Sequence, residues 1–564
     1  MLPILKKSVL VLVAAALGTA AAAQTSVKKG VPNGWHLKDR AKDGYYGISI
    51  DQAYQAVKGR KSNTVVVAVI DSGIDTLHED LKPVLWRNPG EVPGNGIDDD
   101  KNGYVDDVHG WNFIGGKDGR NVKEDSYEAA RVYHKYKDRF APLKSAEGLS
   151  ADDALLYKEW KRAERQVVGG AAEGGVDLLV LKRTYAAAVK SDSALQKAIG
   201  KEVYTGTELK AFQPTTPEAK QARGMFLYFF EANQSMDMTN KAFLEEFNSY
   251  LSGETKKAEA AEKAPKDYRG EIVGDNYNDI NDKFYGNADV MANTPFHGTH
   301  VAGIIAAGRN NGVGVDGVAD NVRIMAIRAV PDGDEHDKDV ALAIRYAVDN
   351  GAKVINMSFG KGFSPEKPWV DDAVKYAASK GVLLVHAAGN DNSDIDTTAN
   401  FPTPVFYNNS GRATNWITVG ASGDPQAGGL KAGFSNYGKK EVDVFAPGVS
   451  IYSTVPGGNT YGIAQGTSMA SPVVAGVAAF LLQYFPTLTP QQVKMVIEKS
   501  AVKPAGDNEF SRYSITGGLV NAYEAAKLAA QITGTKPAAA PAVKKAPAKP
   551  APKKPAAKKP MKTF

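Results

Sequence analysis

No cysteine occurs in the 564-residue sequence. Disulfide bonds, thiolate metal ligands, a cysteine nucleophile and a lipid-modified cysteine are therefore excluded. Beyond the N-terminus the sequence also lacks an uninterrupted apolar run of about 18 residues, so no membrane span is expected. A chain without cross-links takes its stability from a large core or from bound ions, and its 43% hydrophobic content is sufficient for such a core.

Acidic residues are absent from both ends of the chain. Residues 1–23 combine Lys6 and Lys7 with an apolar stretch at 8–18 and an Ala-Ala-Ala cleavage site, which predicts a signal peptide and export to the periplasm or the medium. Residues 534–564 contain nine lysines among prolines and alanines, which predicts a disordered tail. The body between the ends is mildly acidic, so we expect no specific nucleic-acid partner, although the tail could tether the protein to anionic polymers.

The strongest strand signals are short runs of β-branched and other apolar residues. They are continuous rather than alternating, which indicates strands that are buried on both faces. Helical patterns separate several of these runs, so the sequence predicts an α/β fold with a doubly wound, mostly parallel sheet. In such folds catalytic groups gather at the carboxyl ends of the strands. The runs lie at 64–70, 322–330, 353–359, 382–388, 415–422 and 442–448.

Residues 120–268 differ in composition from the rest of the chain. They are rich in Ala, Lys and Glu, show amphipathic helical patterns and contain few strand signals. We therefore predict a helical insertion that divides one α/β domain into residues 61–119 and 269–533. Residues 24–60 are predicted to form an N-terminal arm. The insertion could be a lid over a cleft or a decorative subdomain, and the sequence leaves both open.

Three polar residues lie at the ends of predicted elements. Asp71 ends the first apolar run, His297 begins a helix of small residues, and Ser468 precedes a long apolar helix. Each one alone could be a turn residue or a helix cap. Pro472 is tolerated in a first helical turn, which places Ser468 at or beside a helix N-terminus, where free N–H groups favour an oxyanion. A serine becomes a nucleophile when a base lies within hydrogen-bond reach of it and a carboxylate fixes the tautomer of that base.

Together these residues and their neighbours resemble the subtilisin-like serine proteases, or subtilases. The resemblance rests on the order of four motifs: DSGID at 71–75, HGTHVAGIIAA at 297–307, AAGN at 387–390 and GTSMASPVVAG at 466–476. It covers roughly residues 60 to 113 and 270 to 530, so the insertion between the aspartate and the histidine departs from it. The resemblance implies a serine endopeptidase that needs no catalytic cofactor. We expect a monomer.

The resemblance also implies a role for each matched residue. Ser468 would attack the scissile carbonyl, His297 would transfer the proton, and Asp71 would orient the imidazole. Asn390 would donate its side-chain amide to the oxyanion. The backbone of a polypeptide substrate would pair with an edge segment as an added strand. The substrate-binding residues implied are Ser358, Phe359, Gly360 and Gly389.

Three other interpretations use the same residues. His297 and His300 have a spacing that can hold a metal, but no HExxH motif or third ligand accompanies them, so His300 is expected to pack structurally. An α/β-hydrolase esterase would require G-x-S-x-G, which Ser468 does not match. A non-catalytic relative that only binds peptides is disfavoured because the triad and Asn390 are all present.

Two loops are predicted to bind calcium. The loop 95–107 begins like an EF-hand, with alternate oxygen ligands followed by Gly103, but His109 stands where that motif has a bidentate glutamate. Its candidate ligands are Asp98, Asp100, Asn102, the carbonyl of Tyr104, and Asp106. The family resemblance implies a second, structural site between Asp80 and the loop 308–319. The ligands implied there are Asp80, the side chain of Asn311, and the carbonyls of Arg309, Val313 and Val315.

Overall fold

The computed structural model describes residues 30–169, 178–232, 236, 238–504, 506 and 509–534. The predicted signal peptide at 1–23 lies outside the described residues, as does the predicted tail from residue 535 onward. Both remain predictions.

The centre of the molecule is an eight-stranded sheet in the order β2-β3-β1-β4-β5-β6-β7, with β8 also paired to β6. Every pairing is parallel except that of β6 with β7. The predicted mostly parallel α/β fold is therefore confirmed. The strands are β1 (Val65–Asp71), β2 (Gly110–Asn112), β3 (Val322–Arg328), β4 (Val354–Met357), β5 (Leu383–Ala387), β6 (Trp416–Asp424), β7 (Ala427–Lys431) and β8 (Val444–Pro447).

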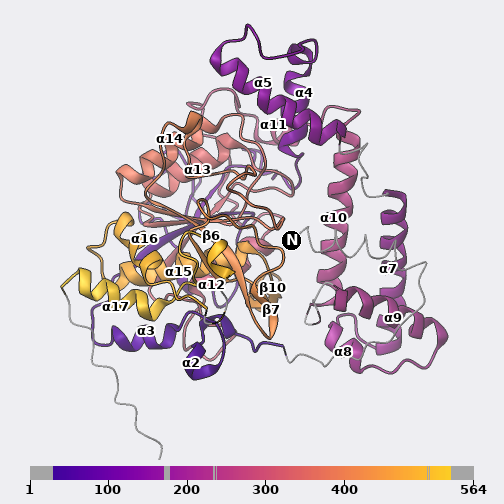
Figure 1. Ribbon diagram of the computed structural model, residues 1–564, viewed down its shortest axis with the longest axis vertical. Coiled ribbons are helices and arrows are strands. Elements are labelled where there is room, and N and C mark those ends of the chain that lie inside the picture. The colour runs from indigo at the N-terminus through magenta and orange to yellow at the C-terminus, as the bar shows by residue number, and fades with distance from the viewer. Residues whose placement is uncertain are drawn as a thin grey trace, which may run out of the picture.

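Helices cover both faces of this sheet, as a doubly wound fold requires (Figure 1). One face carries α13 (Asp337–Asp349) and α14 (Lys367–Ser379), whose apolar residues share one buried cluster with the sheet. The opposite face carries α12 (Phe296–Ala306), α15 (Thr467–Tyr484), α16 (Pro490–Lys499) and α17 (Ala522–Ile532), which share a second cluster. A separate hairpin, β9 (Ile451–Val455) with β10 (Thr460–Ala464), lies beside α12.

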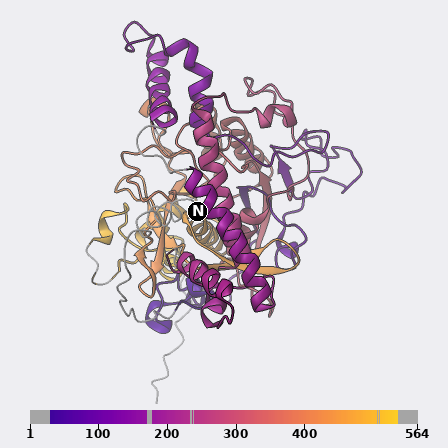
Figure 2. The ribbon, with the colours of Figure 1, turned by 90° about the vertical axis from the view of Figure 1, so that its right-hand side faces the viewer.

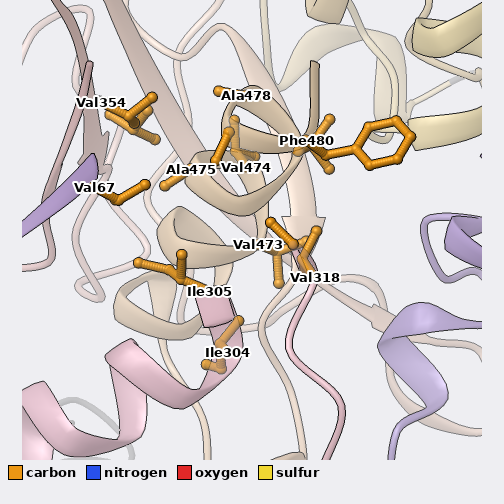
Figure 3. Packing of buried hydrophobic residues seen from close by; sticks show 14 of the residues in the cluster. Val67, Ile304, Ile305, Val318, Val354, Val473, Val474, Ala475, Ala478 and Phe480 are labelled. Atoms are coloured by element: carbon orange, nitrogen blue, oxygen red, sulfur yellow. The ribbon is translucent and has the colours of Figure 1, made fainter. Parts of the chain in front are cut away.

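Helix α15 is the central helix of the second face. Val473, Val474 and Phe480 are wholly buried and belong to one apolar cluster with Val318 and with Ile304 of α12, which Figure 3 shows. Burying each such side chain contributes about 1.5–3 kcal/mol of transfer free energy. Among the described helices, α15 is the one that is long and apolar enough to cross a membrane, but 83% of it is buried inside the protein.

The N-terminal arm is part of this core. It contains η1 (Trp35–Leu37), α2 (Arg40–Asp43) and α3 (Ile50–Ala56). Trp35 is fully buried, and its indole N–H donates to the carbonyl of Val449 at 3.0 Å. Helix α3 packs against α17, so the two ends of the described chain lie together.

The described part of residues 120–268 is helical apart from loops and isolated bridges. Helices α4 (Glu128–Phe140) and α5 (Ala151–Glu164) share one apolar cluster, and a π-helical turn η3 (Arg165–Gly169) follows. A second cluster, rich in phenylalanine, lies between α7 (Leu178–Ile199), α8 (Gly206–Ala211), α9 (Pro217–Ala232) and α10 (Asn240–Ala260). Figure 2 shows the long helices of this group crossing in front of the sheet domain. Helix α11 (Tyr268–Val273) follows them in the chain.

The start of the insertion is fixed to the loops that follow β3 and β4. Asp125 N donates to Asp332 O at 3.0 Å, and Asp332 N donates to Lys123 O at 2.8 Å. The buried ammonium group of Lys361 lies 2.7 Å from Glu128, the first residue of α4. These contacts place the insertion at the carboxyl edge of the sheet, which is also where β1 ends.

Candidate active site

Asp71 and His297 form a direct pair. Asp71 is the last residue of β1 and is 2% exposed, whereas His297 is the second residue of α12 and is half-buried. Nδ1 of the ring lies 2.7 Å from Oδ1 of the carboxylate. A proton on Nδ1 is held by this contact, so Nε2 is left free to act as the base.

A glycine after His297 allows helix α12 to lie close to the end of strand β1. A Cβ atom at Gly298, directly after the histidine, would lie 2.2 Å from the carbonyl oxygen of Gly73. Only glycine fits without moving the backbone. The small residue is therefore part of what brings the imidazole to the carboxylate.

Ser468 is the second residue of α15 and does not cap it. The N-cap is Gly466, and no side chain caps this helix. The alternative that Ser468 is an N-cap is therefore wrong. Its hydroxyl donates to the carbonyl of Ser358 at 3.0 Å, and among the hydrogen bonds of the described residues none joins it to His297. Catalytic hydrogen bonds often tighten only when substrate is bound.

The expectation that Pro472 lies in the first helical turn is wrong. The helix begins at Thr467, so Pro472 is its sixth residue and would normally donate an N–H to Ser468 O. The structure instead supplies the hydroxyl of Ser358 as donor to that carbonyl, at 2.9 Å. A tertiary contact therefore makes the proline tolerable.

Asn390 follows β5 with its side chain in a defined orientation. Its Oδ1 accepts from the backbone N–H of Thr467 at 2.8 Å and from the hydroxyl of Thr467 at 2.9 Å. Because the oxygen is held in this way, the amide N–H₂ is free to donate elsewhere. Thr467 Oγ1 also accepts from Gly389 N at 3.0 Å, so one threonine orients two residues beside the nucleophile. We did not identify Thr467 from the sequence, although its place next to Ser468 was a signal.

The predicted peptide-binding edge follows β4. Phe359 O accepts from the His386 ring at 2.8 Å, so it is occupied within the protein. A Cβ on Gly360 would lie 3.0 Å from Asn400 Oδ1, and a Cβ on Gly389 would lie 2.4 Å from Asn436 Nδ2. Both glycines therefore stand where side chains would crowd the neighbouring backbone and amides.

His300 does not join His297 in a metal site. Its Nε2 lies 3.1 Å from Ile451 O and 3.2 Å from Gly462 O, both in the β9–β10 hairpin. The ring is fully buried, and burial lowers its pKa to about 4. A neutral imidazole that links α12 to the hairpin agrees with the structural role expected from the sequence.

A protein-family model described as "Subtilase family" matches residues 62–514. The chain belongs to the subtilase family. It is 43% identical over 230 residues to the "Thermophilic serine proteinase" of Bacillus sp. (strain AK1). The matched segment covers 41% of this chain and 51% of that protein. It is 40% identical over 234 residues to subtilisin E of Bacillus subtilis (strain 168), covering 41% and 56% of the two. Thermitase of Thermoactinomyces vulgaris is 39% identical over 260 residues, covering 45% and 85%. The chain thus spans about half the length of the first two relatives.

In this subtilase two of the residues predicted for the second calcium site, Asn311 and Val315, contact Asp80. The carboxylate is fully buried and accepts from Asn311 Nδ2 at 2.5 Å, from the hydroxyl of Tyr461 at 3.2 Å and from Val315 N at 3.5 Å. Among the ion pairs of the described residues, none neutralises it. The guanidinium of Arg309 donates to Gly317 O at 2.7 Å, and the backbone N–H of Val313 donates to Asn311 Oδ1 at 3.0 Å.

The loop 95–107 is organised differently from a simple EF-hand. The carboxylates of Asp98 and Asp106 accept backbone N–H groups of the loop, and Asn102 Oδ1 accepts from Tyr104 N at 2.8 Å. Asp100 accepts from Asn102 N at 3.0 Å and also has a carboxylate oxygen within 4.8 Å of oxygens from Glu91 and Asp107. Burial raises the pKa of Asp107 to about 6, against hydrogen bonds that lower it. Glu91 and Asp107 were not among the predicted ligands.

Proposed function

We propose that this subtilase is an exported serine endopeptidase that cleaves polypeptides through Asp71, His297 and Ser468. The 2.7 Å contact between His297 Nδ1 and Asp71 Oδ1 carries the proposal, because it leaves the other ring nitrogen available as a base on the helix that packs against α15. Export is supported by the signal-peptide pattern of residues 1–23.

The reaction follows from these positions. Ser468 Oγ attacks the scissile carbonyl while Nε2 of His297 accepts the hydroxyl proton. The imidazolium, stabilised by Asp71, then donates this proton to the leaving amine as the C–N bond breaks and an acyl-enzyme remains. A water molecule, deprotonated by His297 in the same way, then attacks the acyl-enzyme and releases the carboxylic acid and the Ser468 hydroxyl. None of these steps requires a cofactor.

The oxyanion is stabilised by two donors in this account. Thr467 holds Asn390 Oδ1, and no described residue is hydrogen-bonded to Nδ2; the N–H of Ser468 lies in the first turn of α15, where helical N–H groups lack partners. Donors that are already oriented need no rearrangement when the charge develops. This role explains why the asparagine side chain is fixed at its oxygen end.

The change Asn390→Ala is expected to lower kcat by about 10²–10³-fold with little change in KM, the loss known for an oxyanion-hole asparagine of subtilisin. Steady-state hydrolysis of a peptide anilide measures it. Asn350→Ala, which removes an amide bonded to Tyr346 O at the end of α13, is the matched control. If Asn390→Ala behaves like this control, Asn390 is not an oxyanion donor.

The extended backbone of a substrate would pair with the edge that follows β4, at Ser358 and Gly360. Phe359 O is held by the His386 ring, whereas Ser358 O is released when the Ser468 hydroxyl turns toward His297. Backbone pairing tolerates many sequences, which suits an endopeptidase acting on unfolded chains. The insertion, fixed by Glu128 and Asp125 at the same end of the sheet, would form one wall of this region.

We also propose that Asp80 binds a structural calcium ion together with Asn311 and the carbonyls of Arg309, Val313 and Val315. A buried carboxylate that forms no ion pair with a described residue is costly, and oxygen ligands of this type suit calcium. The loop 95–107 is the second candidate, with Asp100 shared between the predicted ligands and the cluster of Glu91 and Asp107.

Removing calcium is expected to lower the melting temperature of the full-length protein. An ion present at about 100 times its Kd stabilises the folded state by about 2.7 kcal/mol. Thermal unfolding with calcium or with a chelator measures the shift. Asp80→Asn should abolish most of it, and Asp100→Asn reports separately on the other loop. A melting temperature that is independent of calcium in the unaltered protein would contradict both sites.

A further inference from the structure

Pro472 leaves one carbonyl of the nucleophile's own helix without its usual donor. In an α-helix the N–H of residue 472 would bond to Ser468 O, but proline has no N–H. Ser358 Oγ donates to this carbonyl at 2.9 Å, and Ser358 is only 4% exposed. The residue that carries the attacking hydroxyl is therefore tied to the end of β4.

Two further buried side chains determine the direction of that hydrogen bond. Ser471 Oγ donates to Asn356 Oδ1 at 2.8 Å, and Asn356 Nδ2 donates to Ser358 Oγ at 3.0 Å. Ser471 and Asn356 are both fully buried. Because the amide oxygen is already used, the amide N–H₂ faces Ser358, whose oxygen accepts. The hydrogen of Ser358 is then left to donate to Ser468 O.

A return bond completes the connection. Ser468 Oγ donates to Ser358 O at 3.0 Å, so two hydrogen bonds in opposite directions join the two serines. β4 pairs with β1, with Met357 opposite Ile70, the residue before Asp71. The nucleophile is thus held in register with the strand that carries the carboxylate.

We infer that Asn356, Ser358 and Ser471 are positioning residues for the nucleophile, and that Pro472 frees the carbonyl through which they act. This inference rests on the proposed serine hydrolysis. The three side chains act through the backbone of Ser468. They hold the first turn of α15, so that the Ser468 hydroxyl and N–H face the position at which an attacked carbonyl would lie.

The test is a rescue experiment on the full-length enzyme. Ser358→Ala removes the donor and is expected to lower kcat about tenfold with KM nearly unchanged, the rate effect of roughly 1.4 kcal/mol at the transition state. In Ser358→Ala/Pro472→Ala, the new alanine supplies the missing N–H to Ser468 O, so kcat should return to within about threefold of the unaltered enzyme. Pro472→Ala alone is expected to change kcat little. Ser471→Ala should show a smaller fall than Ser358→Ala.

Rates are expressed per active site, counted by titration with a serine-directed phosphonate, so that loss of folded protein does not count as loss of rate. Ser500→Ala is the matched control, because this buried hydroxyl also donates to a helix carbonyl, that of Ile497, away from the site. A kcat of Ser358→Ala within twofold of the control, or a double variant no faster than Ser358→Ala, overturns the inference. If the unaltered enzyme neither hydrolyses peptides nor reacts with the phosphonate, the proposed function fails instead.

Discussion

Replacing Ser468 with alanine is expected to lower kcat on an unfolded protein or peptide substrate by about 10⁶-fold, the loss known when the nucleophile of subtilisin is removed. The acyl-enzyme cannot form without the hydroxyl, and only transition-state binding by the remaining groups persists. Among the described residues the hydroxyl makes one hydrogen bond, to Ser358 O, so the free energy of unfolding should change by only about 1 kcal/mol. Hydrolysis and thermal unfolding of the same preparation measure both effects.

A second test asks whether the losses in kcat caused by replacing His297 and Ser468 are additive. His297→Ala should cost about as much as Ser468→Ala, and the double variant should be no slower than either single variant, because the groups act as one unit. Residues that work independently would give multiplied losses. Such multiplied losses would contradict the assignment of base and nucleophile to one reaction.

The change His36→Leu is expected to make the protein more resistant to acid. His36 lies in the N-terminal arm with both ring nitrogens buried and without hydrogen-bond partners among the described residues. Burial, with smaller contributions from His300 and Arg309, lowers the pKa of this imidazole to about 3. The unfolded state therefore binds a proton near pH 6.5 that the folded state refuses until about pH 3, so the stability present above pH 6.5 is lost as the pH falls.

Leucine has no titratable group, so the variant does not take up this proton on unfolding. Relative to the unaltered protein, the variant should gain about 3 kcal/mol of unfolding free energy between pH 8 and pH 4, since about 1.4 kcal/mol is lost per pH unit below the unfolded pKa. Comparing two proteins isolates the histidine from buried carboxyls such as Glu335, whose pKa burial raises to about 8 and which act in the opposite direction. Denaturant unfolding at both pH values measures the difference. An equal effect of the substitution at pH 8 and pH 4 would show that His36 titrates normally in the folded state.

The fold was predictable because its strands are continuous apolar runs. Each of the six predicted runs overlaps a strand of the sheet, and the polar residues at their ends mark its carboxyl edge. β2 was not predicted, because a three-residue segment, Gly110–Asn112, carries too little pattern. β7 was also missed, since Ala427–Lys431 contains two glycines among its five residues.

Residues that converge only in three dimensions were the hardest to predict. The order of motifs identified Asp71, His297 and Ser468, but nothing in spacing reveals that Asn356 and Ser471 direct the hydroxyl of Ser358. The same reason explains Pro472. The carbonyl that it leaves free is paired with the hydroxyl of Ser358, which directly follows β4, and local helix rules contain no such donor.

The cation sites show the same limit. Asp80 and the loop 308–319 were linked through the family resemblance and lie together in the structure. In the loop 95–107, regular spacing pointed to Asp98, Asp100 and Asp106, and the fold brings Glu91 and Asp107 close to Asp100. The alternating pattern contains neither of these two carboxylates, so spacing alone could not predict them.

The loss expected for Ser468→Ala depends on one claim, that the hydroxyl of Ser468 is activated by His297 and Asp71. Mass spectrometry of the full-length protein after reaction with a peptidyl phosphonate tests it most directly. We predict one adduct per molecule, located on the peptide that contains Ser468, formed rapidly in the unaltered protein and at least about 10³-fold more slowly in His297→Ala. An unmodified Ser468, or a rate of labelling that does not depend on His297, would contradict the account.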